Sequence, residues 1–384
     1  MRSRRHAADL RAVAKLAVDA TTSVTEVVEE MHAVIGSGPA VLGRPLARPV
    51  GALTRLVYGH VRNVAGLVGT GVDVVLAQLD AVLGESVPGA ERDAVVAALN
   101  GVLGDYLEQT GNPLAIPTEL RVGGGAPEAA TSATGKVLVL VHGSSMSDRQ
   151  WRRAGHDHGA ALARDLGVTP VYARYNSGLH ISTNGRALAA ELEARLGGAE
   201  EITLLGHSMG GLVARSACHA ASLAGHGWPA KLRRLVCLGS PHHGSPLERW
   251  GNVVDVLLGI SAYSAPLARL GRVRSAGVTD LRYGNVLDED WAERGRFALG
   301  RDTRHGLPLP EGVACYAVAG TTSKVPGEKL PGDGLVPVDS ALGRHARPEL
   351  TLAFPPEHQH VALGTGHLDL LGEAVYPTLR AWLA

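Results

Sequence analysis

Residues 201–211 read Glu-Ile-Thr-Leu-Leu-Gly-His-Ser-Met-Gly-Gly, an apolar strand pattern that runs into Gly-x-Ser-x-Gly ahead of a helical pattern. A serine on such a sharp strand-to-helix turn projects its hydroxyl above the sheet. Gly206 and Gly210 suit the turn because side chains at either position would collide there. Ser208 is therefore the candidate nucleophile, and the backbone N–H of Met209 faces an oxyanion that develops beside it. An ordinary glycine-rich turn is the alternative.

Alternating strands and helices surround this motif from residue 136 onward. Helical spacing occupies 188–196 and 212–223, with Ser182, Thr183 and Asn184 as possible caps of the first helix. Strand–helix alternation predicts an α/β fold, with a mostly parallel sheet covered by helices on both faces. Ligands bind such sheets at the carboxyl ends of the strands. Apolar runs mark the expected strands at 136–141, 168–175, 201–205, 235–238, 314–319 and 360–363.

The first 120 residues have a different texture. Apolar residues recur there at helical spacing, which predicts an all-helical N-terminal module. A glycine-rich linker at 121–135 separates it from a catalytic domain at 136–384. No residue of the module suggests chemistry. Packing or self-association is its expected role, and contact with a membrane surface is the alternative.

Composition excludes several classes of protein. The 384 residues carry 37 Lys+Arg against 37 Asp+Glu, so the neutral chain offers no electrostatic case for nucleic-acid binding. Its 45% hydrophobic content excludes general disorder. Three cysteines, Cys218, Cys237 and Cys315, show no disulfide framework and are expected as reduced core residues. Charged residues interrupt the apolar stretches near the start, so we expect neither a secretory signal nor a spanning segment, and a cytoplasmic protein.

A family resemblance rests on Gly206–Arg215, GHSMGGLVAR. This string resembles the nucleophile elbow of alpha/beta-hydrolase lipases and esterases, and the resemblance covers about residues 136–384. It implies a bacterial lipase-like or esterase-like serine hydrolase. In this fold a His-Gly after the first strand opens the oxyanion loop, so His142-Gly143 implies that the N–H of Ser144 pairs with that of Met209. A plain strand-end turn is the alternative.

The acid and the base should follow the nucleophile in the order Ser, acid, His. Asp333 lies in a glycine-flanked loop after a strand, and DGLVPVDSA resembles the acid-bearing loop of bacterial lipases. Asp339 is the competitor. His367 follows the last strand in a glycine-rich loop, and GHLDLL resembles the lipase pattern for the base. The predicted triad is therefore Ser208, Asp333 and His367.

Other residues are expected around the substrate. His142, Ser145 and Trp151 belong to the predicted oxyanion loop and its mouth. His242 lies in Gly239-Ser240-Pro241-His242-His243-Gly244, which resembles a lipase loop string. Residues 246–310 are long enough for a cap or lid that contributes Trp250, although an ordinary helical insertion is the alternative.

Metal chemistry is not expected. The His242-His243 pair has no further ligand at a helpful spacing. Asp369 has the spacing of a calcium ligand in some bacterial lipases, but no second carboxylate of such a site is recognisable. The alternative is that Asp369 is the N-cap of the last helix. We therefore expect neither a metal nor a cofactor.

The sequence thus predicts an esterase or lipase that cleaves small-molecule or lipid esters through an acyl-enzyme. An acyltransferase would use the same triad, with an alcohol in place of water. A binding protein on a hydrolase fold would lack a triad member, and here none is missing.

Overall fold

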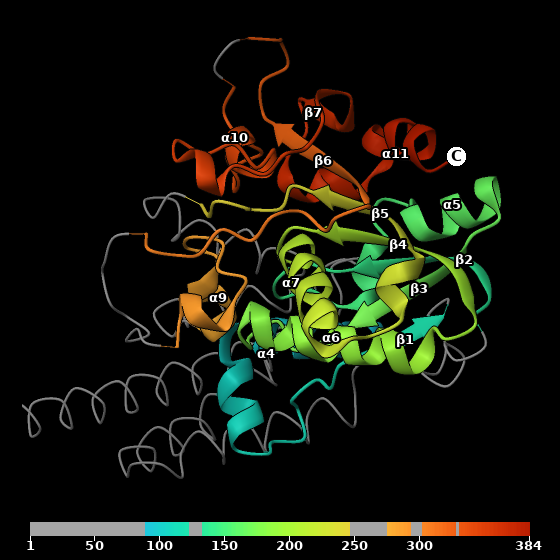
Figure 1. Ribbon diagram of the computed structural model, residues 1–384, viewed down its shortest axis with the longest axis vertical. Coiled ribbons are helices and arrows are strands. Elements are labelled where there is room, and N and C mark those ends of the chain that lie inside the picture. Colours follow the sequence, from blue (N-terminus) through green and yellow to red (C-terminus); the bar gives the residue numbers. More distant parts are fainter. Residues whose placement is uncertain (1–88, 123–132, 246–274, 293–301, 328–329) are drawn as a thin grey trace, which may run out of the picture.

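The computed structural model describes residues 89–122, 133–245, 275–292, 302–327 and 330–384 (Figure 1). The helices expected before residue 89, most of the predicted linker, and Trp250 with much of the predicted cap lie outside these ranges. No helix within the described ranges is both long and apolar enough to cross a membrane.

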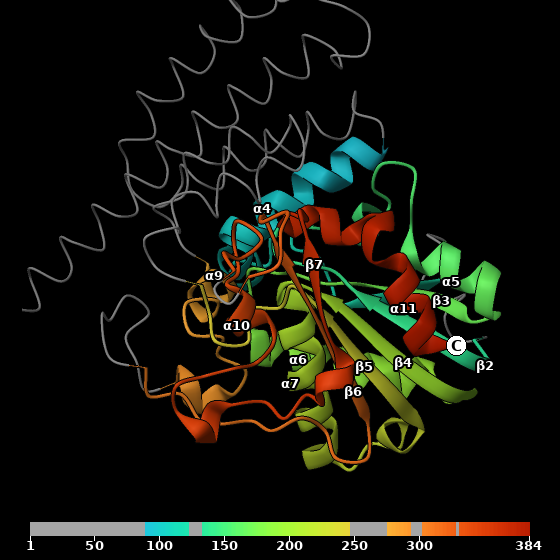
Figure 2. The same ribbon diagram turned by 90° about the horizontal axis from the view of Figure 1, so that it is seen from above.

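The described residues form a seven-stranded sheet in the order β1-β3-β2-β4-β5-β6-β7. Strands β2 to β7 pair in parallel, whereas β1 pairs with β3 in the antiparallel direction. This arrangement, with helices on both faces (Figures 1 and 2), confirms the predicted alpha/beta-hydrolase fold. The strands are β1 (Glu119–Val122), β2 (Gly135–Val141), β3 (Thr169–Arg174), β4 (Ala199–His207), β5 (Leu232–Leu238), β6 (Ala314–Thr321) and β7 (Gln359–Leu363).

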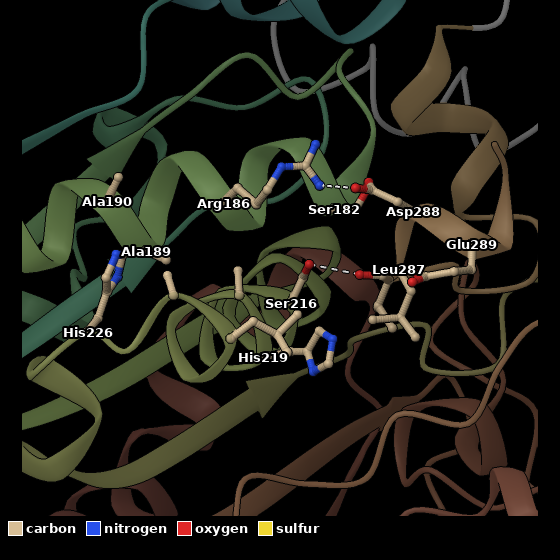
Figure 3. A pocket seen from close by; sticks show the side chains of 14 residues that line it. Ser182, Arg186, Ala189, Ala190, Ser216, His219, His226, Leu287, Asp288 and Glu289 are labelled. Atoms are coloured by element: carbon tan, nitrogen blue, oxygen red, sulfur yellow. Dashed lines mark hydrogen bonds and ion pairs between the residues drawn. The ribbon is translucent and has the colours of Figure 1, made fainter.

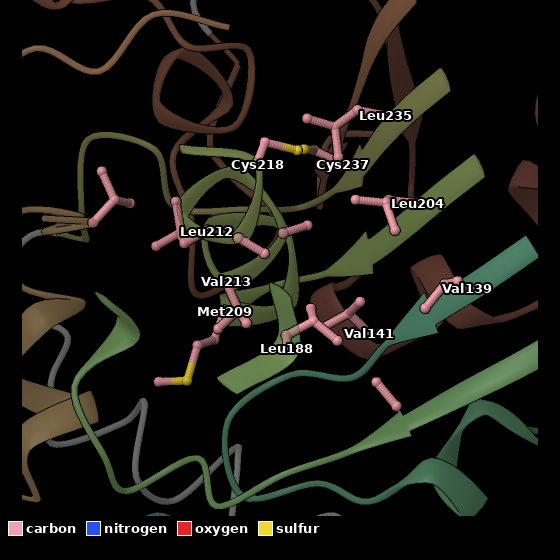
Figure 4. Packing of buried hydrophobic residues seen from close by; sticks show 14 of the residues in the cluster. Val139, Val141, Leu188, Leu204, Met209, Leu212, Val213, Cys218, Leu235 and Cys237 are labelled. Atoms are coloured by element: carbon pink, nitrogen blue, oxygen red, sulfur yellow. The ribbon is translucent and has the colours of Figure 1, made fainter. Parts of the chain in front are cut away.

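Two hydrophobic cores lie on opposite faces of the sheet because successive side chains of a strand alternate between faces. In β2, Val139 and Val141 pack toward α6 (Ile181–Arg195) and α7 (Met209–Ala224), as Figure 4 shows. Leu138 and Leu140 pack on the other side, in the core that includes residues of α5 (His158–Leu166) and α11 (Tyr376–Leu383). Burial on both faces explains the unbroken apolar run of this strand.

The remaining helical elements are short. They are α9 (Ala276–Asp280), α10 (Val338–Ala341) and the 3₁₀ turns η3 (Asp148–Trp151), η4 (Trp228–Lys231), η7 (Asp288–Asp290), η8 (Pro348–Leu350), η9 (Pro356–His358), η10 (His367–Leu371) and η11 (Glu373–Val375).

The start of α6 differs from the prediction. Ser182, Thr183 and Asn184 lie inside the helix, which begins at Ile181 with His180 at the cap position. The backbone N–H of Ile181 donates 2.8 Å to the Oδ2 atom of Asp280 in α9. A carboxylate about 100 residues away in the sequence therefore caps the N-terminus of α6.

The predicted boundary at residue 120 also differs from the structure. The described part of the first 120 residues includes α4 (Gly89–Gln109), and β1 crosses the boundary into the predicted linker. Leu120 is buried in the core and pairs with Ala173 of β3. Asp93 of α4 contacts Arg174 of the same strand at 3.3 Å. The segment 89–122 is thus part of the sheet domain, and four residues of strand are too few to show a sequence period.

Candidate active site

Ser208 occupies the turn between β4 and α7. Its backbone dihedral angles are φ 54° and ψ −124°, a conformation that is costly for a residue with a side chain. Its N–H donates 2.8 Å to the carbonyl of Leu238 at the end of β5, which fixes the turn to the sheet. A Cβ added at Gly206 would lie 2.4 Å from the nitrogen of Gly211, and one at Gly210 would lie 2.0 Å from the oxygen of Val141. The tight turn expected from the sequence is therefore present.

Asp333 and His367 form a buried pair. The Oδ2 atom of Asp333 lies 2.8 Å from the Nδ1 atom of His367, and both side chains are almost completely buried. The other carboxylate oxygen, Oδ1, accepts hydrogen bonds from the backbone N–H groups of Leu335 at 3.0 Å and Val336 at 2.8 Å. These bonds hold the carboxylate in one orientation toward the imidazole.

Asp339, the competing acid, points elsewhere. Its side chain is 74% exposed and lies 3.5 Å from the guanidinium of Arg344. It belongs to the short helix α10, which begins five residues after Asp333. The structure therefore brings Asp333, and not Asp339, to the imidazole of His367.

The imidazole of His367 has one free nitrogen. Its Nδ1 donates to Asp333, which leaves Nε2 as the unprotonated nitrogen. This Nε2 is buried and has no hydrogen-bond partner among the described residues. The structure does not place it in a hydrogen bond with Ser208. In structures without substrate, such catalytic contacts are often long and tighten only when the substrate binds.

Gly239 opens the space for this pair. It follows β5 with φ +56° and donates its N–H to the carbonyl of Val318 in β6 at 2.8 Å. A Cβ here would lie 3.2 Å from the Oδ2 of Asp333 and 3.4 Å from the Nδ1 of His367. The carboxyl ends of β4, β5 and β6 thus converge on one site, as expected for a parallel sheet.

His207 links the turn that carries Ser208 to the loop that carries His367. Its Nε2 donates to the backbone carbonyl of His367 at 3.1 Å, and the two rings lie 4.9 Å apart. A Cβ added at Gly143 would lie 3.2 Å from the Nδ1 of His207 and 3.1 Å from the Cβ of Ser208. Burial holds the pKa of His207 well below its usual value, so the ring is neutral. This histidine therefore touches both loops that flank the nucleophile.

The loop after β2, which the sequence predicts to be the oxyanion loop, is held by several hydrogen bonds. The carbonyl of His142 accepts a 2.6 Å hydrogen bond from the hydroxyl of Tyr175, whose ring stacks on the imidazole at 4.2 Å. The N–H of Ser145 donates 2.9 Å to the Oγ of Ser177 and is therefore occupied. The N–H of Ser144 has no acceptor among the described residues. The N–H of Met209 lies in the first turn of α7, where a helix offers no internal acceptor.

The residues expected around the substrate are mostly buried. Trp151 is completely buried and packs edge-on against His207, so it supports the elbow from the core instead of lining an open mouth. His142 and Ser145 are also buried, and burial lowers the pKa of His142 to about 4. His242 lies against the guanidinium of Arg215 at 3.3 Å. Trp250 lies outside the described residues.

Helix α4 packs against the loop after β2 and against Asn176, which the sequence did not reveal. A Cβ at Gly101 would lie 1.9 Å from the Oγ and 2.8 Å from the Cα of Ser145. The backbone carbonyl of Gly104 accepts a 2.8 Å hydrogen bond from the amide of Asn176. The sequence signal that could have indicated this contact is the pair Gly101 and Gly104 inside an apolar helix, because glycines permit the close approach of another segment.

A hollow on the surface lies away from this site. It has a volume of about 460 Å³ and lies between α6, the outer half of α7 and residues 286–289 (Figure 3). Ser216 donates 2.8 Å to the carbonyl of Val286 at its edge, and Arg186 is paired with Asp288. None of the residues predicted for the active site lines it.

The described residues hold no group of three or more histidine, cysteine or acidic side chains that suits a metal ion. Asp369, considered for calcium, contacts Arg153 at 3.3 Å and accepts a 3.3 Å hydrogen bond from the N–H of Gly366. His242 and His243 contact Arg215 and Arg304 respectively. Arginine neighbours oppose a cation at either place.

The comparisons with known proteins give a similarity for part of this site. A family model of a PGAP1-like alpha/beta domain matches residues 132–299, which include Ser208 but neither Asp333 nor His367. No curated protein matches the chain significantly.

Several solved structures are similar in part. The mature lipase BlEst2 from Bacillus licheniformis is 18% identical with a TM-score of 0.41, over 70% of this chain and 98% of that one. A carboxylesterase structure from the thaumarchaeon Nitrososphaera gargenis is 14% identical with a TM-score of 0.40, over 70% and 94%. The RedJ thioesterase from Streptomyces coelicolor is 17% identical with a TM-score of 0.36, over 67% and 94%.

Proposed function

We propose that this protein hydrolyses carboxylic esters through a covalent acyl-enzyme on Ser208. The observation that carries the proposal is the buried Asp333–His367 pair, 2.8 Å between Oδ2 and Nδ1, beside a serine on a strained strand-to-helix turn. A hydroxyl is a weak nucleophile unless a positioned base accepts its proton. This combination of an elbow serine, an oriented imidazole and a fixed carboxylate is the arrangement that supplies such a base.

The reaction begins when the Oγ of Ser208 attacks the carbonyl carbon of the ester. The Nε2 of His367 accepts the hydroxyl proton and then donates it to the leaving alcohol. Asp333 stabilises the imidazolium that forms and keeps the Nδ1–H tautomer in place. A water molecule then attacks the acyl-enzyme by the same route, which regenerates the serine.

The developing oxyanion is held by the backbone N–H groups of Met209 and Ser144. The first lies at the N-terminus of α7, where the helix dipole favours negative charge. The second belongs to a loop whose neighbouring groups are already hydrogen-bonded to Tyr175 and Ser177. Donors of this kind lower the barrier by about 3–4 kcal/mol each.

The expected substrates are neutral small-molecule or lipid esters, and the mechanism needs no cofactor. The zero net charge of the chain is compatible with an uncharged substrate. Self-association or membrane-surface contact through the N-terminal residues stays a prediction, because residues 1–88 lie outside the described ranges.

The test is hydrolysis of nitrophenyl esters with acyl chains from C2 to C16, together with labelling by a fluorophosphonate that traps nucleophilic serines. The full chain should hydrolyse at least one ester and gain the mass of one label. Ser208→Ala should lose both properties. Ser222→Ala, which changes an exposed serine of the same helix, should keep both.

Activity or labelling that survives in Ser208→Ala would refute the proposed nucleophile. Product analysis with an added alcohol then distinguishes hydrolysis from acyl transfer. Free acid as the main product supports the hydrolase, whereas transfer of most acyl groups to the alcohol assigns the triad to an acyltransferase.

A further inference from the structure

Arg215 of α7 is a buried cation that has no counter-charge among the residues the structure describes. Its side chain is only 4% exposed. Its guanidinium donates to the carbonyl of Leu307 and, at 3.3 Å, to the Nδ1 atom of His242. No carboxylate pairs with it among the described residues. A buried charge that lacks a partner of opposite sign is strongly unfavourable, so this arrangement calls for compensation.

The hydrogen bonds around Arg215 leave two donors without an acceptor. Because the guanidinium donates to the Nδ1 of His242, the proton of that neutral imidazole is on Nε2. This Nε2–H is buried and has no partner in the described part of the chain, and neither has the Nε–H of Arg215. Both residues are at least nine-tenths buried. Buried donors are normally satisfied, so the pair points to an acceptor that is neither a side chain nor a carbonyl of the described residues.

Both side chains line one small cavity. Its volume is about 20 Å³, which is enough for one occupant of about the size of a water molecule. No acidic side chain contributes to its wall. Its wall also includes His243, Arg304 and Leu307.

The neighbouring groups do not neutralise Arg215. Arg304, the second arginine of the wall, has its own carboxylate in Asp302 at 3.4 Å. Burial raises the pKa of the Cys237 and Cys315 thiols to about 12, so both stay uncharged at neutral pH. Cys218, close to Cys237 in Figure 4, has a raised pKa for the same reason.

We infer that this cavity binds a small monovalent anion of the size of chloride, held by the Nε–H of Arg215 and the Nε2–H of His242. Water would satisfy the two donors but would leave the charge uncompensated. Phosphate and sulfate are larger than chloride and carry excess charge. The site is independent of the proposed ester chemistry, and its readout is stability, not activity.

The first experiment measures thermal unfolding of the full chain in sodium chloride and in sodium gluconate at equal ionic strength. Gluconate is a much larger monovalent anion than chloride, so it controls for screening. A ligand that binds only the folded state raises Tm with its concentration. At about five times the dissociation constant of chloride we expect Tm to be about 2–4 °C higher than in gluconate. Equal Tm values in the two salts at all concentrations would overturn the inference.

Variants connect the effect to the cavity. Arg215→Met removes the positive charge and the Nε–H that we propose holds the anion. It should abolish the difference in Tm between chloride and gluconate. Arg164→Met is the matched control, because Arg164 is 71% exposed and lies 2.7 Å from Asp165. It should keep the full difference. A chloride effect that persists in Arg215→Met would place the anion elsewhere and contradict the proposed site.

Crystals of the unchanged protein grown in bromide provide a test that does not depend on a variant folding. Anomalous scattering from bromide in the cavity supports an anion site. Ordered density there without anomalous signal identifies the occupant as water and refutes the inference.

Discussion

At the scale of single residues, Asp333 offers the sharpest test of the proposed machinery. Its Oδ1 is committed to two backbone N–H groups, so only Oδ2 reaches His367. In Asp333→Asn the amide cannot compensate an imidazolium and favours the wrong tautomer of the histidine. We expect kcat for ester hydrolysis to fall roughly 10³–10⁴-fold. The matched variant Asp339→Asn changes an exposed carboxylate and should alter kcat less than about twofold. Equal losses in both variants would contradict the assignment.

His207 is a positioning residue in the same site. Its Nε2–H holds the carbonyl of His367 at 3.1 Å, so its loss should misplace the base without changing the substrate pocket. We expect His207→Phe to lower kcat roughly 10–100-fold with little change in KM. His207→Gln keeps an N–H donor and should recover part of that loss. Steady-state kinetics of both variants, alongside their Tm values, distinguish the two roles. A fall in Tm with unchanged kcat would make His207 merely structural.

Sequence patterns predicted the loops that carry the candidate site residues better than the packing around those loops. Ser208, Asp333 and His367 lie in short loops whose glycines leave few possible conformations, so local spacing carries information about them. Trp151 was expected at a mouth but is completely buried, because contact with His207 depends on how distant segments pack. No sequence pattern near Arg215 predicted that it is buried without a carboxylate partner among the described residues. That state depends on which distant segments pack around its side chain.

At the scale of elements, α4 is expected to set the position of the oxyanion loop. Inside a helix, Gly→Ala normally stabilises by up to about 1 kcal/mol. Gly101→Ala should do the opposite, because its Cβ would lie 2.8 Å from the Cα of Ser145. We expect a lower Tm and a kcat reduced roughly tenfold, measured by unfolding and ester kinetics. Gly197→Ala has no heavy atom within 4 Å of its added Cβ and should change neither. A stabilised, fully active Gly101→Ala would remove the proposed link.

Elements with a strong period were predictable, and those defined by distant partners were not. The strands expected at 136–141 and 235–238 are present as β2 and β5, because burial on both faces demands continuous apolar runs. β1 has only four residues and exists through pairing with β3. The start of α6 depends on Asp280, which no local pattern could indicate.

At the scale of the whole molecule, buried neutral histidines should make stability depend on pH. Burial lowers the pKa of His142 and His158 from 6.5 to about 4. Below pH 6.5 the unfolded chain therefore binds more protons than the folded one. Stability is complete above pH 6.5 and is lost as the pH falls toward 4, by about 1.4 kcal/mol per pH unit for each histidine.

Denaturant unfolding between pH 7.5 and 5 measures this slope. Asp148 and Asp280 have raised pKa values because of burial, and their protonation opposes the trend at lower pH. In His158→Gln the change in unfolding free energy with pH should be smaller, because one of the buried histidines that causes it is gone. A free energy of unfolding that is flat from pH 7.5 to 5 would contradict the buried neutral state of these rings.

The burial of the three cysteines has a practical consequence for spectroscopy. Cys218, Cys237 and Cys315 are the only cysteines of the chain, and all are free and buried. Thiol reagents need an accessible thiolate, so maleimide dyes and spin labels should leave the native protein unmodified. A single cysteine introduced at Leu223, where the native side chain is 77% exposed, would then be the one reactive handle. Distances and motions on the outer end of α7 can be followed by fluorescence or electron paramagnetic resonance without first removing the native cysteines.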